Sequence, residues 1–227
     1  MVEVLPFRGL HYSLPYIQAS VYAPPYDVIS PAQWQCYLDS NPHNIVRLIL
    51  GTRPGDRDWH GQAANTLAEW LERGVLERDA ISAFYGYRQV FSLSDGQSYV
   101  RTGFMGRLRL TEWEQGVYRH ERTRVGPRMD RLMLIRAVHA NMSPVFGLYS
   151  DPEQEIRRWL EPDSQPLVDV VDDDGVQHIF WRIQDSTTVQ AISQAMADRD
   201  VVIADGHHRY ETALTYRAER RAAEGDP

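Results

Sequence analysis

Apolar and polar residues follow two different periods along the chain, and this pattern predicts a mixture of helices and strands. Within residues 59–73 apolar side chains recur at helical spacing, and Gly74 follows directly. A glycine at that place is typical of a helix end, so we expect an amphipathic helix that stops there. Its apolar face would comprise Ala63, Leu67, Trp70 and Leu71.

A second helix is expected to begin just after Ser30. Ser30 is a good N-cap, Pro31 suits the first helical position, and Gln33 lies where a capping box needs an amide side chain. The preceding Pro24-Pro25 pair excludes a helix and favours an extended loop.

Two β-hairpins are expected from strand-like segments joined by turn sequences. Residues 82–93 and 98–110 flank "SDGQ", and residues 165–171 and 176–183 flank "DDDG". Because "DDDG" lacks the spacing and closing glutamate of an EF-hand loop, we interpret it as a turn rather than a calcium site. The apolar run "NIVRLIL" over residues 44–50 predicts a further short strand.

The last third of the chain predicts helix and strand in alternation. Helices are expected over about 128–140 and 186–197, strands over 143–149 and 200–204, and a final helix from about His208. We therefore predict a mixed α/β (α+β) fold of β-hairpins and short helices.

A proline-rich segment marks the weakest point of this pattern. Pro162 and Pro166 divide the chain into an N-terminal α/β region over residues 1–160 and a second region over 161–227. The second region contains the final strand and helix and the loop between them.

Composition narrows the class of protein. The 227 residues are 43% hydrophobic and carry a formal net charge of -7, which is enough apolar material for a core and argues against nucleic acid as a partner. We find no signal-peptide pattern and no apolar run of about 18 residues, so we expect a cytoplasmic protein without a membrane partner. Cys36 is the single cysteine, which excludes an internal disulfide and a cysteine-cluster metal site.

The stretch "VVIADGHHRYETAL" over residues 201–214 carries the strongest candidate chemistry. An apolar strand pattern runs into Asp205-Gly206, and a helix pattern follows at once. Such a turn points backbone N–H groups and the positive end of a helix dipole at one place. Gly206 allows a tight turn and a close approach by an anion, and Arg209 offers a planar fork to phosphate or carboxylate. The pattern predicts a phosphate-binding loop, although neither a Walker A nor a Gly-x-Gly-x-x-Gly sequence occurs.

Two other interpretations of this stretch stay open. Asp-Gly is a common turn, and two adjacent histidines can simply lie on a surface loop. Alternatively, Asp205, His207, His208 and His120 could supply metal ligands. Adjacent histidines tend to point apart, and no His-x-x-x-His spacing is present, so the metal interpretation is the weaker one.

Six segments in a fixed order resemble one bacterial and archaeal family. They are "LPFRGLHY", "APPYDVIS", "NPHNIVRLILG", "YRHERT", "DRLMLIRAVHANMSPVFGLYSD" and "ADGHHRYETALTYR". Together they are similar to the family called domain of unknown function 1015. Members of that family are typically longer, which implies that this chain corresponds to their N-terminal part and that its second region is incomplete.

The Asp-Gly-His-His-Arg sequence also resembles the phosphate-binding box of the ParB/sulfiredoxin superfamily, which includes free serine kinases. The sulfiredoxin nucleophile is a cysteine, and here that position is His207, so sulfiredoxin chemistry is not expected. The resemblance implies a kinase that uses ATP, ADP or pyrophosphate with Mg²⁺ to phosphorylate a small hydroxylated molecule, with free L-serine as the leading acceptor.

The resemblance also suggests a role for each candidate residue. Phosphates would be held by Gly206, His207, His208 and Arg209, and Mg²⁺ by Asp205. In "HERT" (residues 120–123), flanked by Arg119, Arg122 and Arg124, Glu121 is the first candidate base and His120 a phosphate or substrate contact. Asp27, in "PPYDV", is the second candidate base.

Each of these assignments has a structural alternative. Glu121 could form a surface ion pair, and Asp27 could close a turn. Asp130 and Arg131 are further candidates, although an acid at a helix start is favourable for dipole reasons alone. If both candidate bases lay far from residues 205–209, a non-catalytic nucleotide-binding module would be the better hypothesis. A metal-dependent hydrolase would need three of the named ligands to converge. The sequence does not give the oligomeric state.

Overall fold

The computed structural model describes residues 2–53, 55–56, 58–121, 125–162 and 165–225. The chain divides into two compact units, each built from three separate stretches. Unit 1 comprises Met1–Ala19, Glu77–Arg109 and Tyr149–Val201, and unit 2 comprises Ser20–Leu76, Leu110–Leu148 and Val202–Pro227. This partition differs from the division into residues 1–160 and 161–227 that the proline-rich segment predicted, and that division stays a prediction.

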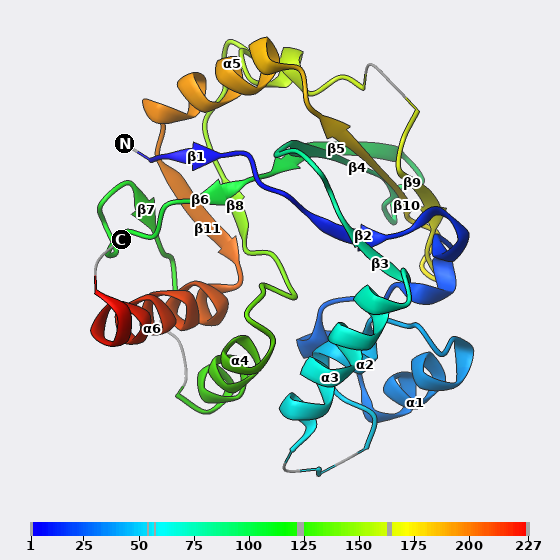
Figure 1. Ribbon diagram of the computed structural model, residues 1–227. Coiled ribbons are helices and arrows are strands. Elements are labelled where there is room, and N and C mark those ends of the chain that lie inside the picture. Colours follow the sequence, from blue (N-terminus) through cyan, green and yellow to red (C-terminus); the bar gives the residue numbers. More distant parts are fainter. Residues whose placement is uncertain (1, 54, 57, 122–124, 163–164, 226–227) are drawn as a thin grey trace. The chain divides into compact units, whose positions relative to one another are not determined.

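Unit 1 contains an antiparallel sheet with the strand order β5-β4-β10-β9 (Figure 1). The strands are β4 (Phe84–Ser92), β5 (Ser98–Met105), β9 (Val168–Val171) and β10 (Gln177–Ile183). β4 pairs with β5 and β9 with β10, so both predicted hairpins are confirmed. The Asp172 backbone N–H donates to the Val176 carbonyl at 3.0 Å, which closes the "DDDG" sequence as a turn.

Short elements complete unit 1. Strand β1 (Val4–Leu5) pairs with β6 (Arg107–Leu108), and β2 (Leu10–Tyr12) pairs with β3 (Leu76–Arg78). The other elements are two 3₁₀ turns, η1 (Leu14–Tyr16) and η4 (Arg157–Trp159), and the helix α5 (Ser186–Ala197). α5 is confirmed over the predicted range and begins at an Asp185 cap whose carboxylate accepts from the Thr188 N–H at 2.7 Å. Trp181 is fully buried in the sheet, opposite Gly86 on the neighbouring strand.

The first half of unit 2 is helical. It contains η2 (Ala19–Val21), η3 (Tyr26–Val28), α1 (Pro31–Ser40), α2 (Val46–Ile49) and α3 (Trp59–Glu72). Both halves of the predicted capping box are present, because Ser30 Oγ accepts from the Gln33 N–H and Gln33 Oε1 accepts from the Ser30 N–H. Gly74 lies just beyond α3 with φ of +68°, a left-handed conformation that suits a glycine after a helix.

The predicted strand over residues 44–50 is wrong, because Val46–Ile49 forms the short helix α2. Asn44 explains the difference. Its side-chain oxygen accepts from the Val46 N–H at 2.9 Å, and its amide donates to two backbone carbonyls of the segment before α1. The apolar residues of α2 are buried on more than one side, so they show no period that separates a buried helix from a buried strand.

The second half of unit 2 combines a small sheet with two longer helices. The sheet has the order β7-β11-β8, with β7 (Val117–Tyr118), β8 (Phe146–Leu148) and β11 (Val201–Asp205). α4 (Val125–Val138) packs against α6 (His207–Glu224), and the two helices lie side by side in Figure 1. Among the described residues, no helix is both long and apolar enough to cross a membrane.

Candidate functional site

The turn from β11 into α6 is built around Gly206. Its backbone has φ of +93° and ψ of 30°, the left-handed conformation that an L-residue adopts only under strain, and this lets α6 begin directly at His207. Gly206 is the N-cap residue and has no side chain with which to cap the first turn of α6. The backbone N–H groups and the positive dipole end at the start of such a helix favour an anion.

Arg209 folds back over this turn. Its guanidinium donates to Ser143 Oγ at 3.0 Å, to the carbonyl of Pro144 and to Asp205 Oδ2. A Cβ added at Gly206 would lie 2.8 Å from Arg209 Nε, so only glycine leaves room for this position of the guanidinium. Arg209 therefore ties the end of β11 to the segment that precedes β8, and Asp205 neutralises it.

His207 is the buried member of the loop, with 1% of its surface exposed. Glu121 Oε1 lies 3.0 Å from His207 Nδ1, but Nδ1 makes no hydrogen bond with a described residue, so the N–H does not point at the carboxylate and the contact is electrostatic. His207 Nε2 accepts a long hydrogen bond of 3.5 Å from the His120 N–H. The His120 ring meets the His207 ring edge-on at 4.5 Å between centroids, and its Nε2 lies 3.3 Å from the Ala204 carbonyl.

Burial lowers the pKa of His207 below its ordinary value. The neighbouring Glu121 carboxylate acts in the opposite direction, and His120 adds to the lowering. The Trp113 ring, 6.3 Å away between centroids, contributes to this apolar surrounding. At neutral pH the site therefore holds an uncharged imidazole next to a half-exposed carboxylate.

A second group of side chains in unit 2 surrounds Tyr26. The Arg131 guanidinium lies 4.1 Å from the Tyr26 ring centroid and donates to the Ile49 carbonyl at 2.9 Å. Arg131 Nε and Nη2 also donate to Asp130 Oδ2 at 3.0 and 2.5 Å. The other oxygen, Asp130 Oδ1, lies 3.0 Å from His60 Nε2. The buried Arg131 is thus held by a carboxylate, a carbonyl and an aromatic face.

Tyr26 connects the two groups electrostatically. Burial raises the pKa of its phenol, Arg131 and Arg209 both act to lower it, and Asp27 and Asp130 act to raise it. These four charges are therefore within electrostatic reach of the phenol, and Arg209 belongs to the loop after β11. Asp27 itself is exposed, in η3.

Comparison with known proteins adds one decisive observation. The profile of the family described as "Protein of unknown function (DUF1015)" matches residues 4–227, which is almost the whole chain. The chain belongs to the DUF1015 family. No curated protein and no solved structure matches it. The likeness of residues 205–209 to the ParB/sulfiredoxin superfamily therefore stays a prediction.

In this DUF1015 member, the structure brings most of the predicted site residues together. Five of them meet at the turn into α6: Glu121, His120, Asp205, His207 and Arg209, with Gly206 between them. Asp130 and Arg131 lie instead beside Tyr26, together with Asp27. His208 occupies the first turn of α6 and is half-buried. Arg122 and Arg124 lie outside the described residues.

The metal interpretation gains nothing from the geometry. Among the described residues, no group of three His, Cys, Asp or Glu side chains could hold a metal ion. The convergence that a metal-dependent hydrolase requires is therefore absent from the described part of the chain. Asp205 pairs with Arg209, and its predicted contact with Mg²⁺ stays a prediction.

Sequence reasoning missed four residues of the DUF1015 site. Ser143 and Pro144 hold Arg209, Tyr26 stacks on Arg131, and His60 contacts Asp130. Three of them lie inside the segments that carry the family resemblance, "APPYDVIS" and "DRLMLIRAVHANMSPVFGLYSD". That location was the available signal, but nothing local in the sequence shows which distant arginine each one meets.

Proposed function

We propose that the loop over residues 205–209 binds a phosphate group and that unit 2 is a phosphotransferase acting on a small hydroxylated metabolite. One observation carries the proposal: the Glu121 carboxylate, named as the first candidate base, lies 3.0 Å from the buried His207 at the start of α6. A candidate base and a helix start that favours anions thus occupy one place. The retained base favours catalysis over binding alone.

Phosphate binding follows from the helix start and its arginine. The positive end of α6, an 18-residue helix, points at the loop, and Gly206 itself adds no side chain to obstruct an oxyanion that approaches the backbone. The Arg209 fork lies beside the same turn. A phosphate in this position would replace Asp205 as the partner of Arg209, which exchanges one anion for another and leaves the arginine neutralised.

Phosphoryl transfer in such a site requires positioning and one proton acceptor. The acceptor hydroxyl would give its proton to Glu121 as its oxygen bonds to phosphorus. At the same time the bond from that phosphorus to the leaving group would break: ADP leaves from ATP, AMP from ADP, and orthophosphate from pyrophosphate. Asp205, once released from Arg209, would be free to contact Mg²⁺, which takes few carboxylates and keeps several waters. Free L-serine is the acceptor to try first, on the resemblance to free serine kinases.

A non-catalytic nucleotide- or phosphate-binding module is the second candidate. The pairing of Arg209 favours it, because the guanidinium already holds Ser143, Pro144 and Asp205 and therefore acts as a structural tie. Displacement of Asp205 by a phosphate would then change the contact between β11 and the segment before β8. A change in this contact on phosphate binding could transmit a regulatory signal without any catalysis.

The test is ³¹P NMR of the purified chain with Mg²⁺ and L-serine, with ATP, ADP and pyrophosphate added in separate samples. We expect an O-phosphoserine resonance with one donor. Glu121→Gln should abolish that resonance but still broaden the donor signals, because it removes the base and keeps the loop. Glu69→Gln, an exposed glutamate of α3 in the same unit, is the matched control and should retain activity.

The other outcomes separate the candidates. Donor resonances that the wild type broadens without forming product would support the binding module. Donor resonances that stay sharp with the wild type would contradict both candidates. Equal product formation by Glu121→Gln and the wild type would remove Glu121 from the reaction.

A further inference from the structure

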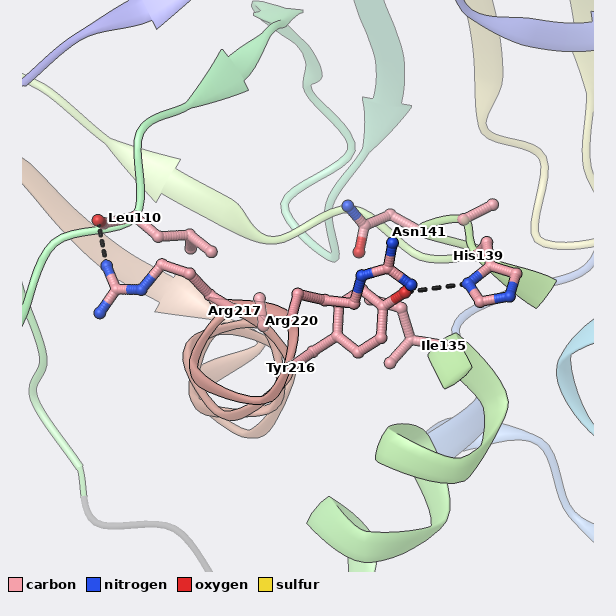
Figure 2. A pocket seen from close by; sticks show the side chains of 9 residues that line it. Leu110, Ile135, His139, Asn141, Tyr216, Arg217 and Arg220 are labelled. Atoms are coloured by element: carbon pink, nitrogen blue, oxygen red, sulfur yellow. Dashed lines mark hydrogen bonds between the residues drawn. The ribbon is translucent and has the colours of Figure 1, made fainter. Parts of the chain in front are cut away.

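A cavity of about 290 Å³ lies in unit 2 between the end of α4 and the middle turns of α6 (Figure 2). Apolar side chains form part of its wall: Leu110, Ile135, Ala140 and Ala213. This volume is close to the lower end of the volumes of pockets that bind small ligands. None of its lining residues belongs to the loop over residues 205–209.

The polar part of the wall is rich in donors. It is formed by His139, Asn141, Tyr216, Arg217 and Arg220. No acidic residue is among the described residues that line the cavity. Two guanidinium groups therefore meet an apolar wall without a carboxylate in the lining to balance them.

Arg220 is the cation that is available to a ligand. Its ion pair with Glu224 is an exposed contact one helical turn away, and pairs of that kind contribute about 0–1 kcal/mol and exchange readily. In Figure 2 the Arg220 side chain extends toward Asn141, over the Tyr216 ring. The Asn141 carboxamide forms no hydrogen bond with a described residue, so it can donate to a ligand that Arg220 also contacts.

Arg217 is held more firmly and forms the opposite wall. It donates to the Leu110 carbonyl and, at 2.6 Å, to Glu112 Oε1, and in Figure 2 it points toward Leu110, away from Arg220. Its buried Nε finds no partner among the described residues. A buried donor without a partner is costly, and an acceptor within the cavity would relieve that cost.

His139 forms the third side of the cavity. Its N–H closes the last turn of α4 on the Ile135 carbonyl at 2.9 Å, with the residue in a left-handed conformation at φ of +50°. The ring is oriented by Tyr216, whose hydroxyl lies 2.9 Å from Nδ1. When that hydroxyl donates to Nδ1, the neutral imidazole carries its proton on Nε2 and adds a donor.

We propose that this cavity binds a small organic anion, with its apolar body against Leu110, Ile135 and Ala213 and its oxyanion held by Arg220 and Asn141. Carboxylate and phosphate monoester groups both offer the oxygen acceptors that a guanidinium fork recognises. The apolar wall selects a ligand with a hydrocarbon or aromatic body over a bare inorganic ion. This site is separate from the loop over residues 205–209 and does not depend on the function proposed for it.

The test is a ¹H–¹⁵N correlation titration of the full chain with benzoate, phenyl phosphate and, as the uncharged counterpart, benzamide. We expect benzoate or phenyl phosphate to shift the amides of Ala140, Asn141 and Ala213, and benzamide to bind at least about tenfold more weakly. The anion that binds more tightly shows whether the site prefers a carboxylate or a phosphate monoester. Arg220→Gln should lower its affinity about tenfold. Arg221→Gln, on the same turn but outside the cavity, should leave it unchanged.

Three results would overturn the proposal. The first is equal binding of benzamide and the anions, which would leave only an apolar pocket. The second is an equal loss with Arg220→Gln and Arg221→Gln, which would indicate general charge attraction. The third is an absence of shifts at the cavity. Shifts by phenyl phosphate that are confined to residues 206–209 belong to that third result and report on the phosphate loop instead.

Discussion

Replacing Gly206 with alanine tests how the start of α6 is held. Gly206 has φ of +93°, and an alanine Cβ there would lie 2.8 Å from Arg209 Nε and 2.9 Å from Arg209 Cζ. The substitution therefore has two consequences, a strained backbone and a displaced guanidinium. Gly74→Ala is the matched control, because Gly74 also has positive φ, at +68°, in the same unit, but no described atom lies within 4 Å of its added Cβ.

The two consequences differ in size. A left-handed backbone costs an L-residue about 1–2 kcal/mol, and this applies at both positions. Displacing Arg209 also weakens its hydrogen bonds to Ser143, Pro144 and Asp205. Because the Asp205 side chain is 55% exposed, we count only about 1 kcal/mol for that loss. We therefore expect Gly206→Ala to lower the free energy of unfolding by about 2–3 kcal/mol and Gly74→Ala by about 1–2 kcal/mol.

Urea denaturation followed by tryptophan fluorescence measures the stability difference, and ³¹P line broadening of pyrophosphate measures binding. Gly206→Ala should weaken pyrophosphate binding about tenfold or more, since Arg209 no longer lies over the turn and a methyl group occupies the approach to the backbone. Gly74→Ala should bind as the wild type does. Equal pyrophosphate affinity for both variants would refute the reasoning, because the position of Arg209 would then have no part in binding.

Three further predictions concern stability. Because burial lowers the pKa of His207, the unfolded chain takes up its proton first, so the free energy of unfolding should fall as the pH drops below the ordinary value of 6.5. In His207→Asn, urea midpoints measured across that range should fall less steeply than in the wild type. Gly86→Ala would place a Cβ 2.0 Å from Trp181 Cε2, so we expect a loss above about 3 kcal/mol and a changed Trp181 emission spectrum. Ser30→Ala removes half of a capping box and should cost about 1 kcal/mol in a urea titration, whereas unchanged stability would contradict the cap.

Local signals in the sequence were enough for elements that depend on neighbours along the chain. The Ser30 cap and the "DDDG" turn are defined within four or five residues, and the structure shows both. The strand prediction for residues 44–50 was wrong because the conformation of this segment depends on residues far away in the sequence. The Asn44 side chain donates to the Ser20 and Tyr22 carbonyls. The buried residues Val46, Leu48 and Ile49 show no period from which helix and strand can be told apart.

The candidate site shows the same limit. The types of side chain in the sequence identify Glu121, His207 and Arg209 as candidate site residues, but only the fold shows which of them lie together. The Arg209 guanidinium, which the sequence offers to phosphate or carboxylate, donates in the fold to Ser143, a residue 66 positions away. Nothing in the sequence distinguishes Tyr26 from any other aromatic residue beside two prolines, although its ring lies against the buried Arg131.

The central claim is that the start of α6 binds phosphate, and a ¹H–¹⁵N correlation titration with pyrophosphate tests it most directly. The account predicts that the largest shifts fall on the amides of His207, His208 and Arg209, that they saturate, and that Arg209→Lys weakens them without moving them elsewhere. Shifts of equal size scattered over many basic surface residues, or none at the three amides, would contradict it.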